Sequence, residues 1–216
     1  MLRTRKQNLY QTFFSVLVLG CIFFSCTDDQ KISKQPVSAD YISEAKKVLQ
    51  DSIVFNARAM MGTVNKTQLP QGCPMKYHFS WNGDILNMKI NKFTVGTMPV
   101  TMWFSINLKF MRLNSWEKNE YPGDEWMKFE GNGGLVKYTA NGIDPSYDDG
   151  DGGAGTVTGY FNYKTMEIEF VTSFNVLNVT SDVFKQKIDK SRIAHFDEDF
   201  AKFERDLEKY KKDNGL

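Results

Sequence analysis

The residues best suited to contact a polar ligand gather in one short segment, 116–126. Three aromatic residues and four acidic residues fall within it: Trp116, Tyr121 and Trp126, with Glu117, Glu120, Asp124 and Glu125. An aromatic ring can stack on the apolar face of a sugar while a carboxylate accepts hydrogen bonds from its hydroxyls. Glycoside hydrolysis also uses two carboxylates, but at a defined separation that neighbours in sequence do not guarantee. The segment predicts sugar contact, or else a polar turn anchored by its tryptophans.

A second candidate site is the acidic, glycine-rich segment 141–155. It contains four aspartates, Asp144, Asp148, Asp149 and Asp151. A calcium loop of the EF-hand type needs oxygen ligands at fixed positions and a glutamate at the twelfth. Placing Asp151 at the fifth position puts Tyr147 first and Thr158 twelfth. The pattern therefore favours a solvated loop between two strands over a calcium site.

Few other residues of this chain are suited to metal binding or nucleophilic catalysis. The two histidines, His78 and His195, are far apart in sequence, and Cys73 stands beside Pro74. Zinc needs three or four convergent ligands, and a reactive cysteine needs an activating base. Neither a Gly-x-Ser-x-Gly nucleophile motif nor a Gly-x-x-x-x-Gly-Lys phosphate loop occurs. We expect no catalytic residue, no metal and no cofactor, and therefore a protein that is not an enzyme.

The N-terminus has the pattern of an export signal. Arg3, Arg5 and Lys6 precede an apolar run at 13–24 that is too short to span a bilayer. Ser25-Cys26 follows, and this end of the run resembles a lipobox, in which the cysteine is acylated and becomes the first mature residue. Cys21 also fits, but cleavage there would leave an apolar stub. We predict a signal peptide at 1–25 and lipid attachment at Cys26.

The polar segment 26–38, which contains Pro36, is expected to link the lipid flexibly to the folded domain. Thr27-Asp28-Asp29 resembles the acidic tether that follows the lipid cysteine in many lipoproteins of Bacteroidetes. That resemblance implies anchoring in the outer membrane and display at the cell surface, although the periplasmic face stays open. The membrane is then a partner through Cys26.

Composition limits the fold and the partners. The net charge is +1, with 27 basic and 26 acidic residues and no basic patch, so nucleic acid is not an expected partner. Removal of the leader leaves about 190 residues, enough for one domain with a core. Cys73 is then the one cysteine besides Cys26, which excludes a disulfide within the domain. The aromatic content of 14% with frequent glycine favours strands.

Alternating apolar residues predict a mainly β domain over 39–190. A helix follows Ser38, whereas 50–62 fits either a helix or a strand. One-sided strands then cover 75–81, 86–95 with a bulge near Asn91, 100–110, 126–130, 135–140, 156–163 and 166–179. Asn82-Gly83 marks a hairpin turn. Seven to nine such strands predict an antiparallel β-barrel or sandwich.

The C-terminal segment, 191–216, predicts an amphipathic helix packed on this domain. Its apolar residues recur at spacings of three and four: Ile193, Phe196, Phe200, Phe203, Leu207 and Tyr210. Asp197 is the expected N-cap, and Gly215 follows the end. The helix is short for a coiled coil with a partner, so we expect it to cover the sheet or one barrel end.

Two short motifs resemble a known family. The segment 90–100, Ile-Asn-Lys-Phe-Thr-Val-Gly-Thr-Met-Pro-Val, is similar to a corner motif of calycin-like lipoproteins from Bacteroidetes, and Gly159-Tyr160-Phe161-Asn162-Tyr163 is similar to their closing hairpin. The resemblance covers about residues 73–180. It implies a lipocalin-like barrel on a lipid tether and carries over no catalytic residue.

These observations favour a non-enzymatic binding module of the cell envelope, a barrel whose interior or open end accommodates a small apolar or amphipathic ligand. The expected lining consists of five large inward side chains: Phe79, Trp81, Met88, Met102 and Phe104. The same side chains would simply fill a narrow barrel. Two other functions stay open: a surface glycan-binding accessory lipoprotein that uses Trp116, Tyr121 and Trp126, and a structural or adhesive surface protein.

Overall fold

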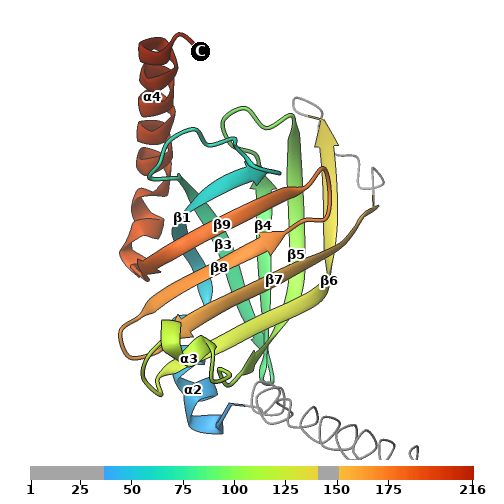
Figure 1. Ribbon diagram of the computed structural model, residues 1–216, viewed down its shortest axis with the longest axis vertical. Coiled ribbons are helices and arrows are strands. Elements are labelled where there is room, and N and C mark those ends of the chain that lie inside the picture. Colours follow the sequence, from blue (N-terminus) through green and yellow to red (C-terminus); the bar gives the residue numbers. More distant parts are fainter. Residues whose placement is uncertain (1–36, 141–150) are drawn as a thin grey trace, which may run out of the picture.

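The computed structural model describes residues 37–140 and 151–216, shown in Figure 1. The elements follow one another as α2 (Ala39–Val48), β1 (Asp51–Met61), β2 (Val64–Asn65), β3 (Cys73–Asn82), β4 (Ile85–Phe93), β5 (Val100–Met111), α3 (Glu117–Glu120), β6 (Trp126–Ala140), β7 (Asp151–Asn162), β8 (Glu167–Ser173), β9 (Val179–Lys187), the 3-10 helix η1 (Lys190–His195) and α4 (Phe196–Asn214).

The strands form a closed antiparallel barrel. From β3 to β9 each strand pairs with the next along the chain, β3 pairs with β1, and β1 returns to pair with β9. The closing register places Arg58 opposite Asp182 and Met61 opposite Val179. In the described part of the chain, eight strands thus form the barrel and the short β2 extends β1. The structure confirms the mainly β prediction and selects the barrel over the sandwich.

Strand alternation fills this barrel with apolar side chains. In β5 every second residue from Val100 to Phe110 is buried, while the residues between are more exposed. Phe170 of β8 meets the rings of Phe55, Tyr77 and Phe129, which come from three other strands. Gly159 makes room for them, since a Cβ there would lie 2.4 Å from the Phe170 Cβ and 2.5 Å from the Phe129 ring. The centre is therefore close-packed at Phe170.

Two local predictions are confirmed, and one open alternative is resolved. The segment 50–62, which fitted either a helix or a strand, forms the strand β1 over residues 51–61, between β3 and β9. The Asn82-Gly83 turn joins β3 to β4, with Gly83 at φ +58°. The register of β4 shifts between Ile90 and Phe93, where a bulge was expected, and Lys92 adopts φ +58°.

Other local predictions were wrong. The strands expected at 126–130 and 135–140 form one strand, β6, with an irregularity between Gly131 and Gly134. β7 begins at Asp151, inside the segment expected to be a loop. The strand expected at 166–179 ends at Ser173, and β9 follows as a separate strand. The turn between them places Asn175, Leu177 and Asn178 at positive φ, a conformation usually found at glycine.

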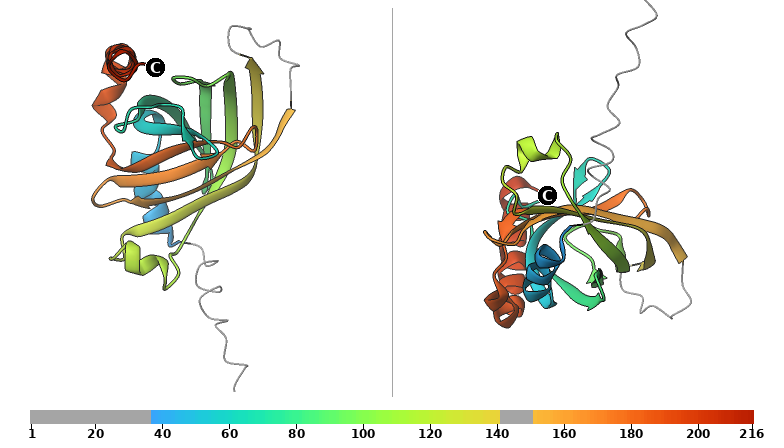
Figure 2. Two further views of the ribbon diagram at one scale, coloured as in Figure 1. Left: turned by 45° about the horizontal axis from the view of Figure 1, so that its top comes forward. Right: turned by 90° about the horizontal axis from the view of Figure 1, so that it is seen from below.

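The N-terminal helix α2 lies at one end of the barrel, where the described chain begins (Figure 2). Its Ile42, Ala45 and Val48 are buried against the core. The Trp81 indole donates a hydrogen bond to the Leu49 carbonyl at 2.6 Å, and the Tyr41 ring packs on Tyr163 of the β7–β8 hairpin. We call this end, with α2, α3 and the β7–β8 hairpin, the tether end.

The C-terminal helix α4 packs on the outside of β3, as Figures 1 and 2 show. Phe203 and Leu207 are its buried residues, and Gly215 ends it at φ +67°. The N-cap is His195 and not Asp197, because η1 carries the chain directly into the helix and places Asp197 in its first turn. Among the described residues, no helix is both long and apolar enough to cross a bilayer.

Candidate functional site

The five residues expected to line a ligand cavity lie in the barrel core. Phe79, Met88, Met102 and Phe104 are at most 5% exposed, and Trp81 is partly buried against the same cluster. Trp81 stacks on Phe110 with ring centroids 5.7 Å apart. Phe104 meets Phe174 edge to face at 5.3 Å. Their rings therefore contact other core rings.

The three aromatic residues expected to hold a sugar are separated by the fold. Trp116 is 73% exposed, whereas Tyr121 and Trp126 are each 7% exposed. Trp126 points out of the barrel, because it alternates with the inward-facing Met127 on β6, and it packs with Leu113 and Tyr121 in a small cluster on the outer wall. The Lys185 ammonium lies 4.7 Å from the centre of the Trp126 ring. Trp116 thus remains the exposed ring of the three.

A polar cluster on the outer wall fixes α3 to the barrel; we call it the α3 clasp (Glu117, Tyr121, Lys128, Tyr160 and Glu169). Glu117 is 7% exposed. Its carboxylate pairs with the Lys128 ammonium at 2.9 Å and accepts a hydrogen bond from the Tyr160 hydroxyl at 3.0 Å. The start of α3 is also stabilised locally. The Glu117 carboxylate accepts a hydrogen bond from the Asn114 backbone amide, and the Asn114 side-chain oxygen accepts one from the Glu117 backbone amide, as in a capping box.

The buried carboxylate of the clasp is stabilised by the groups around it. Burial alone would raise the pKa of Glu117, but hydrogen bonds from the Asn114 amide and the Lys128 ammonium hold it below its ordinary value. The Tyr121 hydroxyl donates to Glu169, and its ring stacks on Tyr160 at 4.0 Å. Burial and the nearby carboxylates raise the pKa of both tyrosines. The clasp therefore holds an ionised Glu117 and neutral tyrosines, arranged to position α3.

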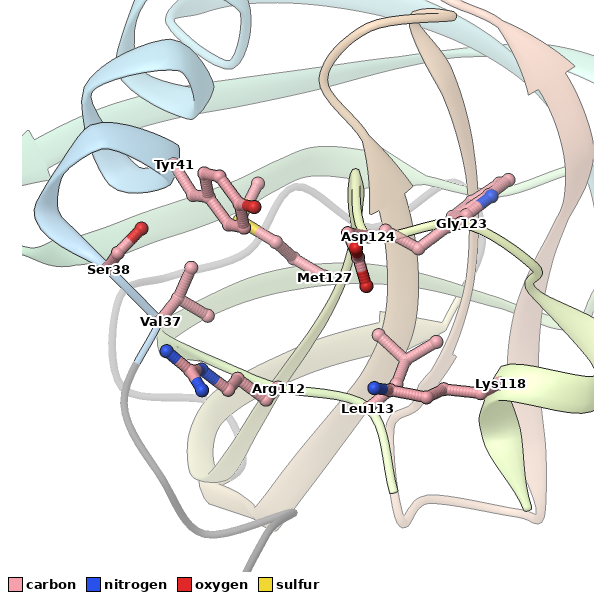
Figure 3. Close-up of a pocket in the computed structure, with 10 residues that line it drawn as sticks. Val37, Ser38, Tyr41, Arg112, Leu113, Lys118, Gly123, Asp124 and Met127 are labelled. Atoms are coloured by element: carbon pink, nitrogen blue, oxygen red, sulfur yellow. The ribbon is translucent and has the colours of Figure 1, made fainter. Parts of the chain in front are cut away.

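Next to the clasp, a pocket of about 230 Å³ opens at the tether end (Figure 3). We call it the tether-end pocket. It lies between the start of α2, the segment after β5 and the start of β6. Its lining consists of Val37, Ser38, Tyr41, Arg112, Leu113, Lys118, Gly123, Asp124, Trp126 and Met127. Five of these are apolar or aromatic, and three carry charge.

The charged residues of the pocket are not engaged by the protein. Within the described ranges, the side chains of Arg112, Lys118 and Asp124 make no ion pair or hydrogen bond. The neighbouring carboxylates are satisfied, because Glu117 pairs with Lys128 and Glu125 with Lys164. Two cations and one carboxylate therefore surround an apolar wall formed by Val37, Leu113 and Met127, an arrangement that suits a small amphipathic molecule with an anionic group.

Other reactive groups are placed less favourably. The His78 ring nitrogen bonds the Ser52 hydroxyl at 2.7 Å, but among residues 37–140 and 151–216 no carboxylate bonds that imidazole. Burial first, and then Lys76 and Lys89, lower its pKa. Cys73 is buried, and burial followed by Glu204 raises the pKa of its thiol. The described residues contain no group of three or more His, Cys, Asp or Glu side chains arranged to hold a metal.

Some of the sequence predictions fall outside the described residues. Cys26, Asp144, Asp148 and Asp149 belong to this group, and Asp151 opens β7. Arg112 and Met127 of the pocket were missed by sequence reasoning, as was Tyr41 as a pocket residue. They come from three separated segments, so no spacing along the chain groups them. The one available signal was strand parity, which places Met127 and Trp126 on opposite faces of β6.

Comparison with known proteins places the chain in a family. No curated protein and no solved structure matches it. One family model matches residues 26–215, which is most of the chain. The chain therefore belongs to the family described as a domain of unknown function, DUF4903.

Proposed function

We propose that the mature protein is a lipid-anchored, non-enzymatic binding protein of the cell envelope. Its ligand is a small amphipathic molecule with an anionic group, and its site is the tether-end pocket. The single observation that carries this proposal is the lining of that pocket, in which cations without an ion pair among the described residues surround an apolar wall. The barrel has the role of a calycin-like scaffold, and the site lies at its tether end.

The size and lining of the pocket define the class of ligand. Its volume of about 230 Å³ is below the range of roughly 300–1,000 Å³ that is usual for drug-sized ligands, so the ligand is small. Val37, Leu113 and Met127 form the apolar part of the lining, against which a short alkyl chain would lie. Arg112 and Lys118 supply donors for a carboxylate or phosphate, and Arg112 can bind either one in bidentate fashion. Asp124 disfavours a ligand that carries several negative charges.

The anchor rests on the export pattern of the sequence. A short apolar run followed by Ser25-Cys26 is typical of a lipoprotein leader. The family match begins at Cys26 itself, which agrees with a mature chain that starts at this residue. Localisation in the outer membrane is part of the same proposal and is what the resemblance of Thr27-Asp28-Asp29 to lipoprotein tethers implies.

A binding titration with matched probes tests the site. Octanoate and octanol share an alkyl chain and differ in charge, and calorimetry measures their affinity for the full mature protein. We expect octanoate to bind and the double variant Arg112→Ala, Lys118→Ala to bind it roughly tenfold more weakly, a change of about 1.4 kcal/mol. The matched control is Arg205→Ala, Lys212→Ala on the exposed face of α4, which should bind as the unmodified protein does.

Three results separate the parts of this proposal. Equal binding of octanol and octanoate would mean that the pocket binds an alkyl chain but does not recognise an anionic group. Equal loss of affinity in both double variants would place the effect in net charge and not in the pocket. Absence of binding by either probe would contradict the proposed function.

A further inference from the structure

We infer that the tether end of the barrel lies against the bilayer that holds the lipid of Cys26, with Trp116 in the headgroup region. This inference rests on the lipid anchor of the proposed function and adds an orientation to it. The opposite end, at the β8–β9 turn, then faces away from the membrane. The partner is a lipid surface.

The point where the chain enters the fold supports this orientation. Val37, the first described residue, lines the tether-end pocket together with Lys118 of α3. Val37 follows Cys26 by eleven residues, and a fully extended chain covers at most about 3.6 Å per residue, so the reach is at most roughly 40 Å. If the chain between Cys26 and Val37 is less than fully extended, α3 lies still closer to the lipid, because α3 lies beside the point where the chain enters the fold (Figure 1).

Trp116 is the side chain suited to meet that surface. Among the large hydrophobic side chains of the described residues it has the highest exposure, 73%, and it has no aromatic partner there. Tryptophan is enriched at membrane interfaces, where the ring enters the apolar edge and the indole nitrogen stays among polar groups. The other tryptophan at this end, Trp126, is 7% exposed and already packed, so it is not available for this role.

The charges at this end are compatible with a lipid headgroup layer. Arg112 and Lys118 are exposed and can bind headgroup phosphates. The acidic residues are partly neutralised: Lys164 pairs with Glu125, whereas Glu120 and Asp124 have no cation partner among the residues that the structure describes. With both signs present, the contact depends on Trp116 and on the anchor more than on net charge. The pocket then opens toward the bilayer, which would supply an amphipathic ligand directly.

Site-specific fluorescence tests the orientation with the lipidated, full mature chain in vesicles of phosphatidylethanolamine and phosphatidylglycerol. An environment-sensitive dye is attached through Asn119→Cys, next to Trp116, or through Leu177→Cys in the β8–β9 turn as the matched control. Cys73 does not compete for the label, because it is buried. Quenching by lipids that carry a nitroxide on the upper acyl chain measures how close each dye lies to the bilayer.

We expect quenching at position 119 to be severalfold stronger than at 177, and to fall toward the value at 177 when Trp116→Ala is added. Equal quenching at the two positions in protein that floats with the vesicles would overturn the orientation and leave the anchor in place. Protein that incorporates no labelled palmitate and does not float would contradict the anchor instead. If Trp116→Ala leaves strong quenching unchanged, Trp116 is not part of the membrane contact. If a soluble polysaccharide protects the dye in the absence of vesicles, Trp116 binds glycans instead. Either result overturns the inference.

Discussion

The barrel interior and the tether end are built from similar aromatic residues that do different work. Inside, Phe170 and its neighbours are surrounded by other rings, and Gly159 leaves the space they need. At the tether end, Tyr121 and Trp126 pack on the outer wall within reach of charged groups, and Trp116 extends into solvent. The interior has the features of a stable core, whereas the tether end combines a polar clasp, a pocket and an exposed ring.

The difference teaches that a large inward-facing aromatic residue is weak evidence for a ligand cavity. Burial of a ring against other rings already stabilises the fold, without any ligand. Charged residues beside an apolar wall that have no ion pair within residues 37–140 and 151–216, such as Arg112 and Lys118, point more directly to a ligand. If this distinction holds, substitutions in the interior will change stability and substitutions at the tether end will change binding.

The largest expected change in the free energy of unfolding comes from a substitution in the barrel interior. Phe170→Ala removes a ring that contacts Phe55, Tyr77 and Phe129, so it should lower the free energy of unfolding by about 3–5 kcal/mol. Urea unfolding followed by circular dichroism measures it. Octanoate affinity of the folded variant should be unchanged. A loss of affinity without a loss of stability would mean that the interior is the binding site.

A smaller effect is expected in the α3 clasp. Glu117→Gln leaves Lys128 without its closest carboxylate and should cost about 1–3 kcal/mol at neutral pH. Because the pKa of Glu117 is held below its ordinary value in the folded protein, its charge stabilises the fold above the unfolded pKa. This contribution is lost as the pH falls through the folded pKa.

The unfolding free energies of the unmodified protein and of Glu117→Gln should therefore converge as the pH is lowered below the ordinary carboxyl range. Glu130→Gln is the matched control, because Glu130 lies farther from Lys128, at 3.6 Å, and is 39% exposed. Its effect should be small at every pH. A gap between Glu117→Gln and the unmodified protein that does not depend on pH would show that the carboxylate charge is not what stabilises the clasp.

The smallest effect is expected on the exposed face of α4, which belongs to neither region. Lys202 pairs with Asp206 one turn later, and both side chains are accessible to solvent. Lys202→Ala should change the unfolding free energy by no more than about 0.5 kcal/mol. Thermal unfolding at low and high salt checks this. A change above 1 kcal/mol, on the order of a buried contact, would mean that this face packs on something.

Sequence reasoning succeeded where one periodicity decided the outcome. The alternation of β5 and the spacing of Phe203 and Leu207 identified the strand and the helix, because each pattern reports a single buried face. The β8–β9 turn was missed, since Asn175 and Leu177 adopt positive φ without a glycine to mark it. The burial of Tyr121 was missed for another reason: its covering ring, Tyr160, comes from β7 and is remote in sequence.

The candidate site was less predictable than the fold. The sequence shows that the segment 116–126 is rich in aromatic and acidic residues, but the packing of the barrel decides which of them meet. Trp126 and Tyr121 turned toward the wall, and Lys118 and Asp124 joined Arg112 and Tyr41 around the pocket. Such groupings depend on how three chain segments meet at one end of the barrel, which no local pattern encodes.

Photo-crosslinking with an octanoate analogue that carries a diazirine on its alkyl chain tests the central claim most directly. After irradiation of the full mature protein, digestion and mass spectrometry map the labelled peptides. The account predicts labels on peptides that contain Val37–Tyr41, Leu113 or Met127, with excess octanoate competing them away. Competed labels on the peptides of Phe79, Trp81 and Met88 would place the ligand inside the barrel and contradict the account.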